Sequence, residues 1–370
     1  MPAPKVKSVS VPSALPNLRG FDYVEVFVGN VRQATHYYET VWGFEPIAFR
    51  GLESGSNNEI SMAMKQGNIS IRLTGAVSNS SGVAEHLHLH GEGTARVAFS
   101  TDNVGQCYET VLKQGAVSVH DPTVTADECG RVSTAEIKTP FGISHVFIDR
   151  SEYTGPFLPG FRPVMSKQRG TPLVTELDHI AIAVEAGTLE ESATFYKEVF
   201  GFETAHREDV ATELSGMNSH VVQHLTGSCK FPLVEPVVGK KKSQVQEFLS
   251  FHGGPGVQHL AFSTPDIVST VRELRKNAVE FLKIPESYYS GLERRVGSLG
   301  AGGAAIRELG ILVDHDEWGQ LLQIFARPIQ DRPTSFFEVI ERRGALGFGG
   351  GNIRALFEAI EREQALRGTL

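Results

Sequence analysis

Residues 20–47 read GFDYVEVFVGNVRQATHYYETVWGFEPI, and residues 176–204 read ELDHIAIAVEAGTLEESATFYKEVFGFET. Each stretch predicts a short strand, a helix with an aromatic stripe, and a Gly-Phe pair that opens the next strand. A second pair repeats further along, since residues 91–117 read GEGTARVAFSTDNVGQCYETVLKQGAV and residues 254–279 read GPGVQHLAFSTPDIVSTVRELRKNAV. Duplication on this scale predicts two similar α+β domains and excludes a solenoid of short repeats.

The joint between the two copies is marked by turn-forming residues. Glycine and proline concentrate in residues 153–160 and again in residues 170–172, as is typical of a connecting segment. We therefore expect a flexible tail over residues 1–18, a first domain over 19–155, a linker over 156–174 and a second domain over 175–370.

Composition bounds the function. The chain has 370 residues, 41% hydrophobic and 21% charged, with a net charge of −8, so it predicts an ordinary globular protein without the basic surface that nucleic acids or anionic membranes require. No apolar run is long enough to span a bilayer. The three cysteines form no pattern and indicate a reducing cytoplasm. A homo-oligomer, most simply a dimer, is expected.

The two copies differ where metal ligands would lie. His179 and His259 stand on strands of the second copy, and the matching residues of the first copy are Tyr23 and Arg96. Two neutral imidazoles on adjacent strands can hold a divalent metal, whereas a tyrosine and an arginine do so poorly. The duplication therefore predicts a metal site in the second domain alone.

Glu338 is the predicted third ligand. It lies between four large apolar residues in the run Phe336-Phe337-Glu338-Val339-Ile340, where a carboxylate is costly unless it is paired or bound to a metal. Two histidines and one carboxylate would make the facial triad of a non-haem Fe(II) oxygenase, with three positions left open. The alternative is that Glu338 pairs with Arg342 or Arg343.

Three other patterns receive structural interpretations. His86, His88 and His90 alternate along what we interpret as a surface strand, with no carboxylate at a plausible place. Residues 314–316 (Asp-His-Asp) predict a hairpin turn. The glycine-rich segment 297–303 matches no phosphate-binding loop and predicts a flexible loop.

A series of motifs in the second half identifies a family. They are GPGVQHLA (254–261), LLQIF (321–325), QDRPT (330–334), FFEVIER (336–342) and GFGGGN (347–352). In this order they resemble 4-hydroxyphenylpyruvate dioxygenase and its relative 4-hydroxymandelate synthase, which belong to the vicinal-oxygen-chelate superfamily. The resemblance implies an α+β fold of two tandem domains, each a half-open barrel of paired βαβββ modules. The first domain would be a degenerate copy without metal.

The resemblance also implies a chemistry. Fe(II) would be bound by His179, His259 and Glu338. The substrates would be 4-hydroxyphenylpyruvate, whose own 2-oxo acid chelates the iron, and O₂. The resemblance further implies a substrate pocket and a terminal helix that closes over it as a lid. The implied pocket residues are Ser219, Val234, Gln244, Gln323, Phe325, Phe336, Phe348, Asn352 and Ile353.

Two further expectations concern single side chains near this pocket. Strand alternation points Gln258 away from His259, so Gln258 is excluded from the predicted pocket. Asn352 is the expected N-cap of the terminal helix.

Two departures from the dioxygenase pattern bear on the product. The homogentisate-forming enzymes carry an asparagine where this chain has Val234, and a phenylalanine where it has Ile353. Aliphatic residues at both places resemble the mandelate synthases, although residues 330–334 follow the dioxygenase form. Val234 cannot hydrogen-bond the ring and Ile353 cannot stack on it. We therefore expect hydroxylation at the benzylic carbon, giving 4-hydroxymandelate, with homogentisate as the alternative product.

Two other classes within the same superfamily stay open at this point. A metal-free ligand-binding protein would bind no stoichiometric Fe(II) and consume no oxygen. An extradiol ring-cleaving dioxygenase would consume a catechol, and the FFEVIER motif argues against it.

Overall fold

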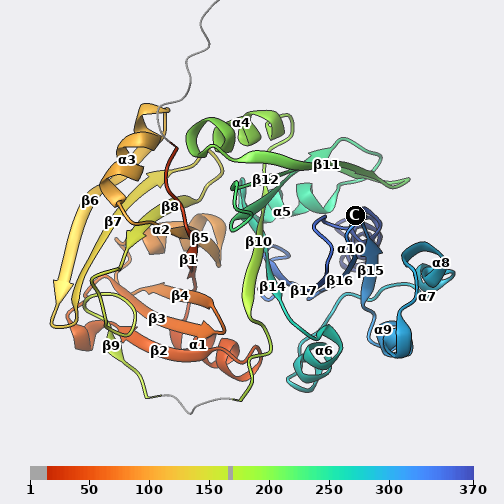
Figure 1. Ribbon diagram of the computed structural model, residues 1–370, viewed down its shortest axis with the longest axis horizontal. Helices are drawn as coiled ribbons and strands as arrows, with labels where there is room; N and C mark the ends of the chain where they lie inside the picture. Colours follow the sequence, from red (N-terminus) through yellow and green to blue (C-terminus); the bar gives the residue numbers. More distant parts are fainter. Residues whose placement is uncertain (1–14, 166–169) are drawn as a thin grey trace, which may run out of the picture.

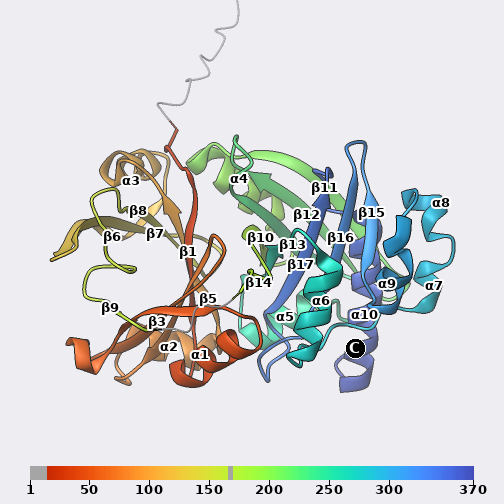
Figure 2. The ribbon, with the colours of Figure 1, turned by 60° about the horizontal axis from the view of Figure 1, so that its bottom comes forward.

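The computed structural model describes residues 15–165 and 170–370, so most of the expected tail and the middle of the expected linker lie outside it. Two strongly curved sheets stand side by side, and most of the helices lie on their outer faces (Figures 1 and 2). The α+β architecture with tandem half-barrels is confirmed.

Residues 20–163 supply the strands of the first sheet. Its strands are β1 (Gly20–Phe27), β2 (Glu45–Arg50), β3 (Glu59–Gln66), β4 (Ile69–Ala76), β5 (Gly93–Ser100), β6 (Val117–Asp127), β7 (Gly130–Lys138), β8 (Ser144–Asp149) and β9 (Arg162–Pro163). Its helices are α1 (Val31–Thr40), α2 (Gly82–His90) and α3 (Val104–Lys113), with a 3₁₀ turn at Leu52–Ser54. The strand order is β6-β7-β8-β5-β1-β4-β3-β2-β9.

Residues 176–343 supply the strands of the second sheet. Its strands are β10 (Glu176–Ala183), β11 (Glu203–Ala211), β12 (Gly216–Gln223), β13 (Lys230–Val237), β14 (Gly256–Ser263), β15 (Leu312–His315), β16 (Gln320–Phe325) and β17 (Phe336–Arg343). Its helices are α4 (Leu189–Phe200), α5 (Gln244–His252), α6 (Ile267–Lys276), α7 (Glu286–Tyr289), α8 (Leu292–Val296), α9 (Gly303–Glu308) and α10 (Gly350–Arg367), with a 3₁₀ turn at Gly300–Gly302. The strand order is β11-β12-β13-β10-β14-β17-β16-β15.

The duplication predicted from the sequence extends to fine detail. β1 pairs antiparallel with β5, and β10 pairs in the same way with β14. Both ladders carry two bulges at corresponding places, the second of them between Glu25 and Val26 in one and between Ala181 and Ile182 in the other. Because a bulge twists and bends the strand that carries it, the two sheets curve in the same manner.

Local sequence explains why the matching helices begin where they do. The side chains of Asn103 and Asp266 cap α3 and α6 by accepting hydrogen bonds from the backbone N–H three residues on. Asn30 caps α1 in the same way. Such caps satisfy N–H groups that have no partner within the helix.

A shared core joins the two halves. The indole of Trp42, after α1, lies edge-on to Phe337 of β17 with ring centroids 4.8 Å apart. On the opposite side, Tyr196 of α4 lies 2.9 Å from Nε2 of His145 of β8 through its hydroxyl oxygen. Side chains of each half therefore pack against the other half at both places.

Two of the structural interpretations need correction and one is confirmed. Residues 86–90 lie in the helix α2, not in a strand, because Ser81 caps a helix that runs to His90. The glycine-rich segment ends in the 3₁₀ turn and the start of α9. The hairpin turn is confirmed, since β15 ends at His315 and β16 begins at Gln320. In the described residues, no helix combines the length and apolar character needed to cross a bilayer.

Candidate metal centre and substrate pocket

Three neighbouring strands bring the predicted metal ligands together. His179 lies on β10, His259 on β14 and Glu338 on β17, and these strands are adjacent in the second sheet. His259 is opposite Ala181, and Glu338 is opposite Ala261. Small alanines at those places leave the three longer side chains room to converge within the curve of the sheet.

The ligand atoms form a nearly equilateral triangle. Nε2 of His179 lies 3.3 Å from Oε2 of Glu338, Nε2 of His259 lies 3.4 Å from the same oxygen, and the two Nε2 atoms are 3.4 Å apart. Two ligand atoms at about 2.0–2.2 Å from one cation are separated by about 3.0–3.5 Å when the angle at the metal is about 90–110°. The triangle therefore fits one divalent metal. It is also the only group of three potential ligands with this spacing among the described residues.

The electrostatics of the triangle call for a cation. Glu338 is 1% exposed, and neither arginine considered as its partner pairs with it: Arg342 pairs with Asp178, and Arg343 pairs with Glu341. This buried carboxylate, which faces two imidazoles, has no permanently cationic partner among the described residues, and a bound metal ion would supply the positive charge that stabilises it.

Burial and charge set the protonation of the two histidines in opposite directions. Burial, reinforced by His179, holds the pKa of His259 well below its ordinary value. Burial also lowers the pKa of His179, but the carboxylates of Glu338 and Asp178 raise it above its ordinary value. A neutral His259 has the lone pair that a metal ligand needs.

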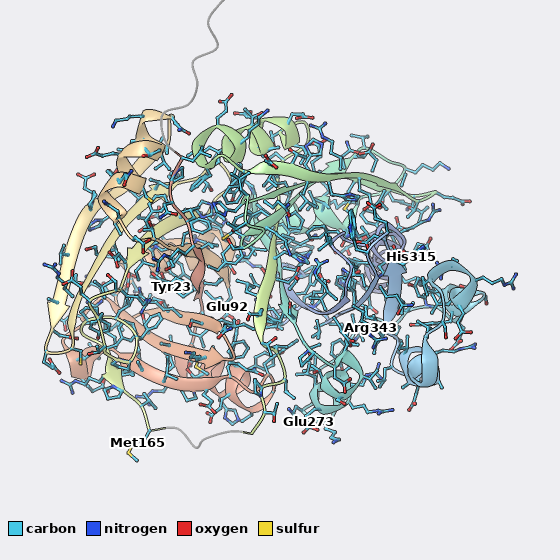
Figure 3. All side chains as sticks on the ribbon, in the orientation of Figure 1. Tyr23, Glu92, Met165, Glu273, His315 and Arg343 are labelled. Carbon is cyan, nitrogen blue, oxygen red and sulfur yellow. The ribbon has the colours of Figure 1, made fainter. Side chains whose placement is uncertain are left out.

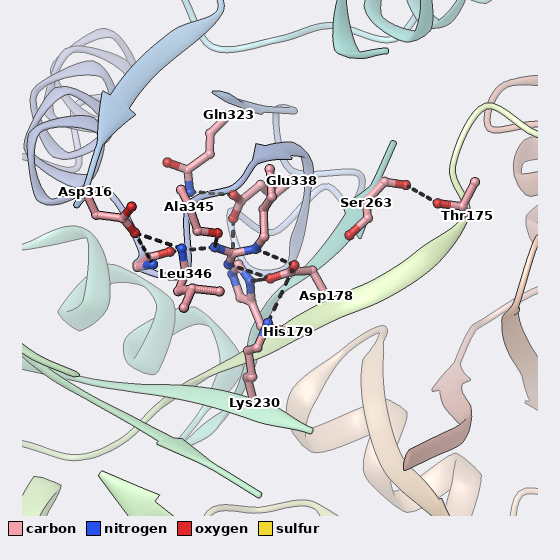
Figure 4. Close-up of polar contacts among 12 residues, drawn as sticks. Thr175, Asp178, His179, Lys230, Ser263, Asp316, Gln323, Glu338, Ala345 and Leu346 are labelled. Carbon is pink, nitrogen blue, oxygen red and sulfur yellow. Dashed lines mark hydrogen bonds and ion pairs between the residues drawn. The ribbon is translucent and has the colours of Figure 1, made fainter. Parts of the chain in front are cut away.

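An ion pair behind the triangle orients His179 (Figure 4). Oδ1 of Asp178 lies 2.8 Å from Nδ1 of His179, and the guanidinium of Arg342 binds both oxygens of Asp178 at 2.7 and 2.9 Å. Burial would raise the pKa of Asp178, but Arg342 and His179 hold it well below its usual value. The ionised carboxylate keeps the proton of His179 on Nδ1 and leaves Nε2 free for a metal.

A second chain of hydrogen bonds positions Glu338. Gln323 of β16 donates from Nε2 to Oε1 of Glu338 at 2.8 Å (Figure 4). Asn352 donates from Nδ2 to Oε1 of Gln323 at 2.8 Å, and Tyr288 donates to Oδ1 of Asn352 at 2.6 Å. The chain connects α7 and α10 to the carboxylate, so the terminal helix is coupled to the proposed ligand.

A small pocket of about 50 Å³ lies beside the triangle. Seven of the nine predicted substrate residues line it: Ser219, Val234, Gln244, Gln323, Phe325, Phe348 and Ile353. Phe336 instead stacks on His259, with ring centroids 4.9 Å apart. Asn352 is fully buried and acts through Gln323. It is not the N-cap of α10, because Gly349 holds that place and Asn352 lies in the first turn.

Gln258 was wrongly excluded, since it lines the pocket beside His259. The second bulge of the β10–β14 ladder explains the error. Ala181 pairs with His259 and the next residue, Ile182, pairs with Val257, so Gln258 has no partner of its own. A bulge interrupts the alternation that had placed Gln258 on the other face.

Other pocket residues were missed as well. They are His206, Met217, Val221, Pro232 and Leu356. Their strand neighbours had been predicted, so alternation along β12 and β13 carried the signal for Met217, Val221 and Pro232. Asp178 was adjacent to a predicted ligand, but nothing in the sequence connects it to Arg342 across 164 residues.

Comparison with known proteins defines first the class and then the family. The model of the glyoxalase/bleomycin resistance protein/dioxygenase superfamily matches residues 20–147 and 176–296, so the two half-barrels are a tandem of that superfamily's domains. The chain is 38% identical to 4-hydroxyphenylpyruvate dioxygenase of Yarrowia lipolytica over 100% of this chain and 98% of that protein. It is also 38% identical to the enzyme of the same name from Coccidioides posadasii, over 97% and 96%.

A solved structure agrees with these relatives. A triple mutant of 4-hydroxymandelate synthase from Streptomyces coelicolor superposes with a TM-score of 0.85 and 33% identity, over 95% of this chain and 100% of that one. The chain therefore belongs to the family of 4-hydroxyphenylpyruvate dioxygenases and 4-hydroxymandelate synthases, and it is an enzyme of this dioxygenase type.

Proposed function

We propose that this enzyme oxidatively decarboxylates 4-hydroxyphenylpyruvate with O₂, using Fe(II) held by His179, His259 and Glu338. The observation that carries the proposal is the triangle of two Nε2 atoms and one carboxylate oxygen, with sides of 3.3–3.4 Å. Two histidines and a carboxylate on one face of a metal are the ligand set of non-haem Fe(II) oxygenases. Bound iron would supply the one-electron and dioxygen chemistry that side chains lack.

The role of the chain is to position the substrate and exclude water. We assign the side-chain amides of Gln244 and Gln258 to hydrogen bonds with polar groups of the substrate, because both side chains line the pocket. Oε1 of Gln244 is buried and has no hydrogen-bond partner among the described residues. Phe325 and Phe348 offer apolar surface for the ring. Ser219 supplies a hydroxyl on β12, opposite Val234 of β13.

The pocket must open for the substrate to enter. A void of about 50 Å³ is far below the ~300–1,000 Å³ of typical ligand pockets. Ile353 and Leu356 of α10 form part of its wall, so we propose that α10 moves outward as a lid. A larger cavity of about 300 Å³ shares Gln244 and Gln258 with the pocket and provides space for such a rearrangement.

Two products are compatible with this reaction. The names of the curated relatives support homogentisate, which was the alternative expected from the sequence, and we take it as the first candidate. The wall of the pocket supports 4-hydroxymandelate, because Val234 and Ile353 both line it with aliphatic side chains. Which carbon lies nearest the metal decides between them, and a displacement of about 1 Å is enough.

Product identification tests both the proposed reaction and the choice between the two products. The full-length protein would be freed of metal, loaded with Fe(II) or Zn(II), and supplied with 4-hydroxyphenylpyruvate, ascorbate and O₂. We expect oxygen uptake by the protein loaded with Fe(II) and none by the protein loaded with Zn(II). Because homogentisate and 4-hydroxymandelate are isomers, the product must be separated chromatographically against both standards. Absence of oxygen uptake with Fe(II) would overturn the proposed reaction.

The pocket variant Val234→Asn combined with Ile353→Phe sharpens the choice of product. If the unaltered enzyme forms 4-hydroxymandelate, the double variant should shift the product towards homogentisate, because it restores a hydrogen-bonding group and a stacking partner for the ring. An unchanged product ratio in an active double variant would contradict this role of the two residues.

Three further assignments remain proposals of ours. The linker over residues 156–174 separates the two domains, although its strand β9 (Arg162–Pro163) pairs with β2 of the first sheet. The three cysteines carry no disulfide among the described residues and suit a reducing cytoplasm. The active form is a homodimer.

A further inference from the structure

The first half-barrel contains a cavity of its own, at the place that the metal centre occupies in the second. Its volume is about 260 Å³, and its lining includes Tyr23, Arg72, Arg96 and Phe161. Figure 3 places Tyr23 within the curve of the first sheet. Residues 158–161, which precede β9, close one side. Nothing in the proposed reaction uses this cavity.

Buried ion pairs occupy the floor of the cavity. Glu25 is 0% exposed and accepts hydrogen bonds from Thr74 at 2.6 Å and from Nη1 of Arg96 at 3.0 Å. Its Oε1 also lies 3.1 Å from Nε of Arg72. Nε of Arg96 donates to Glu136 at 2.9 Å. Both oxygens of Glu25 are therefore already engaged, and Oε2 of Glu59, a third carboxylate in the lining, lies 3.9 Å from Nη2 of Arg72.

The donors of the cavity are not all engaged. Among the described residues, Nη1 of Arg72 and Nη2 of Arg96 have no hydrogen-bond acceptor, since the bonds of both guanidinium groups use their other nitrogens. The hydroxyl of Tyr23, a residue 4% exposed, has no partner in this part of the chain either. Arg50 stands at the mouth with its guanidinium unpaired by any described residue. Unused N–H and O–H donors that converge on one space suit an anion, above all a planar carboxylate.

The remaining wall is mixed, with polar groups from Glu59, His120, Thr125 and Thr134 beside one apolar face. Val146, Leu158, Pro159 and Phe161 form that face, and the guanidinium of Arg72 lies 5.6 Å from the ring centroid of Phe161. The volume is just below the ~300–1,000 Å³ of typical ligand pockets, so a molecule with a single ring fits best. The positions of the histidine ligands are filled by Tyr23 and Arg96, which excludes a metal of the same kind.

We propose that the first half-barrel binds a small arylaliphatic carboxylate, with the carboxylate on the free donors of Arg72, Arg96 and Tyr23 and the ring against Leu158 and Phe161. This site is separate from the metal centre and does not depend on the proposed reaction. In this proposal the duplicated domain has a second ligand cavity, which binds its ligand through charged side chains and not through a chelated metal.

The test is a binding titration of the full-length protein with 3-phenylpropanoate, which lacks the 2-oxo group needed to chelate a metal through two oxygens. Calorimetry or ligand-observed NMR would measure the affinity. Tyr23→Phe removes one unpaired hydroxyl and should weaken binding about fivefold. Arg50→Glu reverses an exposed, unpaired charge at the mouth and should weaken binding at least about tenfold.

Two controls locate the probe. Arg32→Glu makes the same charge reversal on an exposed position of α1 outside the cavity and should leave the affinity within about twofold. His259→Ala removes a proposed metal ligand and should also leave it unchanged. Far-UV circular dichroism confirms that each variant is folded.

The affinities of these variants for 3-phenylpropanoate distinguish the proposed site from the pocket of the metal centre. Saturable binding that Arg50→Glu and Tyr23→Phe weaken, and that both controls preserve, supports the site. The absence of saturable binding up to about 10 mM, the weak end of measurable affinity, would overturn it. So would binding that His259→Ala abolishes and Arg50→Glu preserves, because the probe would then lie in the pocket of the metal centre.

Discussion

The two half-barrels share the same backbone topology, but different side chains lie at their centres. Both central ladders carry the same two bulges, and corresponding strands pair in the same order. The β-ladder register matches three residues of the first sheet to the three proposed ligands of the second. Tyr23, Arg96 and Val146 occupy the places of His179, His259 and Glu338.

The difference lies in where the positive charge comes from. In the first centre, the buried carboxylate of Glu25 is balanced by Arg72 and Arg96, which are part of the chain. Burial would raise the pKa of Glu25, but these two arginines lower it below its usual value. In the second centre, Glu338 faces imidazoles that carry no permanent charge. The first centre therefore balances its buried carboxylate with arginines of the chain, whereas the second, with histidines, would need a bound cation to do the same.

Removal of the carboxylate from the metal centre should have the largest effect on activity. Glu338→Gln should lower turnover of 4-hydroxyphenylpyruvate by about 10³-fold or more, because a neutral amide neither balances nor binds the metal well. Oxygen uptake and metal analysis would measure it. The matched control is Glu25→Gln, which changes the same group in the other half and should keep its activity per folded molecule. Equal losses in both variants would contradict the division of roles.

Removal of the carboxylate from the first centre should instead affect stability. Glu25→Gln leaves two largely buried arginines without their shared partner, and we expect a loss of about 3–5 kcal/mol in the free energy of unfolding. Urea denaturation followed by circular dichroism would measure it. Glu338→Gln, tested without metal, should lose little or gain stability, since it removes a buried charge that has no cation. A change below about 0.5 kcal/mol in Glu25→Gln would refute the interpretation.

The sequence predicts the duplicated parts of this molecule well. The comparison of the two copies singled out His179 and His259 because an imidazole appears in one copy and not in the other, and the structure brings their Nε2 atoms within 3.4 Å. Glu338 was predicted as the third ligand because burial of its charge among apolar residues is unfavourable in free energy unless the charge is paired. Seven of the nine pocket residues that the family resemblance implied line the pocket, because they stand at the matching places of the shared motifs.

The features that escaped prediction depend on irregular or distant structure. Gln258 faces the pocket because of a bulge, which no period-2 pattern reveals. The pair of Asp178 and Arg342 joins residues that only the folded sheet brings together. The helical histidines of α2 imitate strand alternation because two of them, His86 and His90, are one helical turn apart. The product depends on displacements that side-chain identity alone does not fix.

Acid should weaken the contact where the two halves meet at α2 and α5. His252 of α5 stacks on His90 of α2 with ring centroids 4.8 Å apart, and His86 and Arg332 lie near. Burial lowers the pKa of His252 to about 4. The folded protein therefore binds fewer protons than the unfolded chain between about pH 6.5 and 4, so stability is complete above this window and falls as the pH drops through it.

The expected loss from His252 is about 2 kcal/mol between pH 7 and pH 5. Urea midpoints at the two pH values would measure it, and His252→Gln should flatten the dependence. His120→Gln changes an exposed histidine of the first half and should keep the dependence of the unaltered protein. A pH dependence that is unaltered in His252→Gln would show that other groups cause it.

The hydrogen-bond chain from the terminal helix to Glu338 should give a graded and smaller effect. Partners of metal ligands typically contribute about 10–100-fold to metal affinity or activity. Gln323→Leu, which removes the direct partner of Glu338, should fall in this range. Tyr288→Phe acts two hydrogen bonds further away and should lower Fe(II) affinity by about 3–10-fold. Competition with a chelator would measure the affinity.

The neighbouring tyrosine provides the matched control for that chain. Tyr289 donates to the backbone carbonyl of Ile311 and makes no bond to Asn352, so Tyr289→Phe removes the same hydroxyl without interrupting the chain. If Tyr288→Phe and Tyr289→Phe lower the affinity equally, the effect is a general loosening of α7, and α10 is not coupled to the metal. If only Tyr288→Phe does so, the second half-barrel has a connection between its terminal helix and its centre for which the first half-barrel, with Val146 in place of Glu338, has no counterpart.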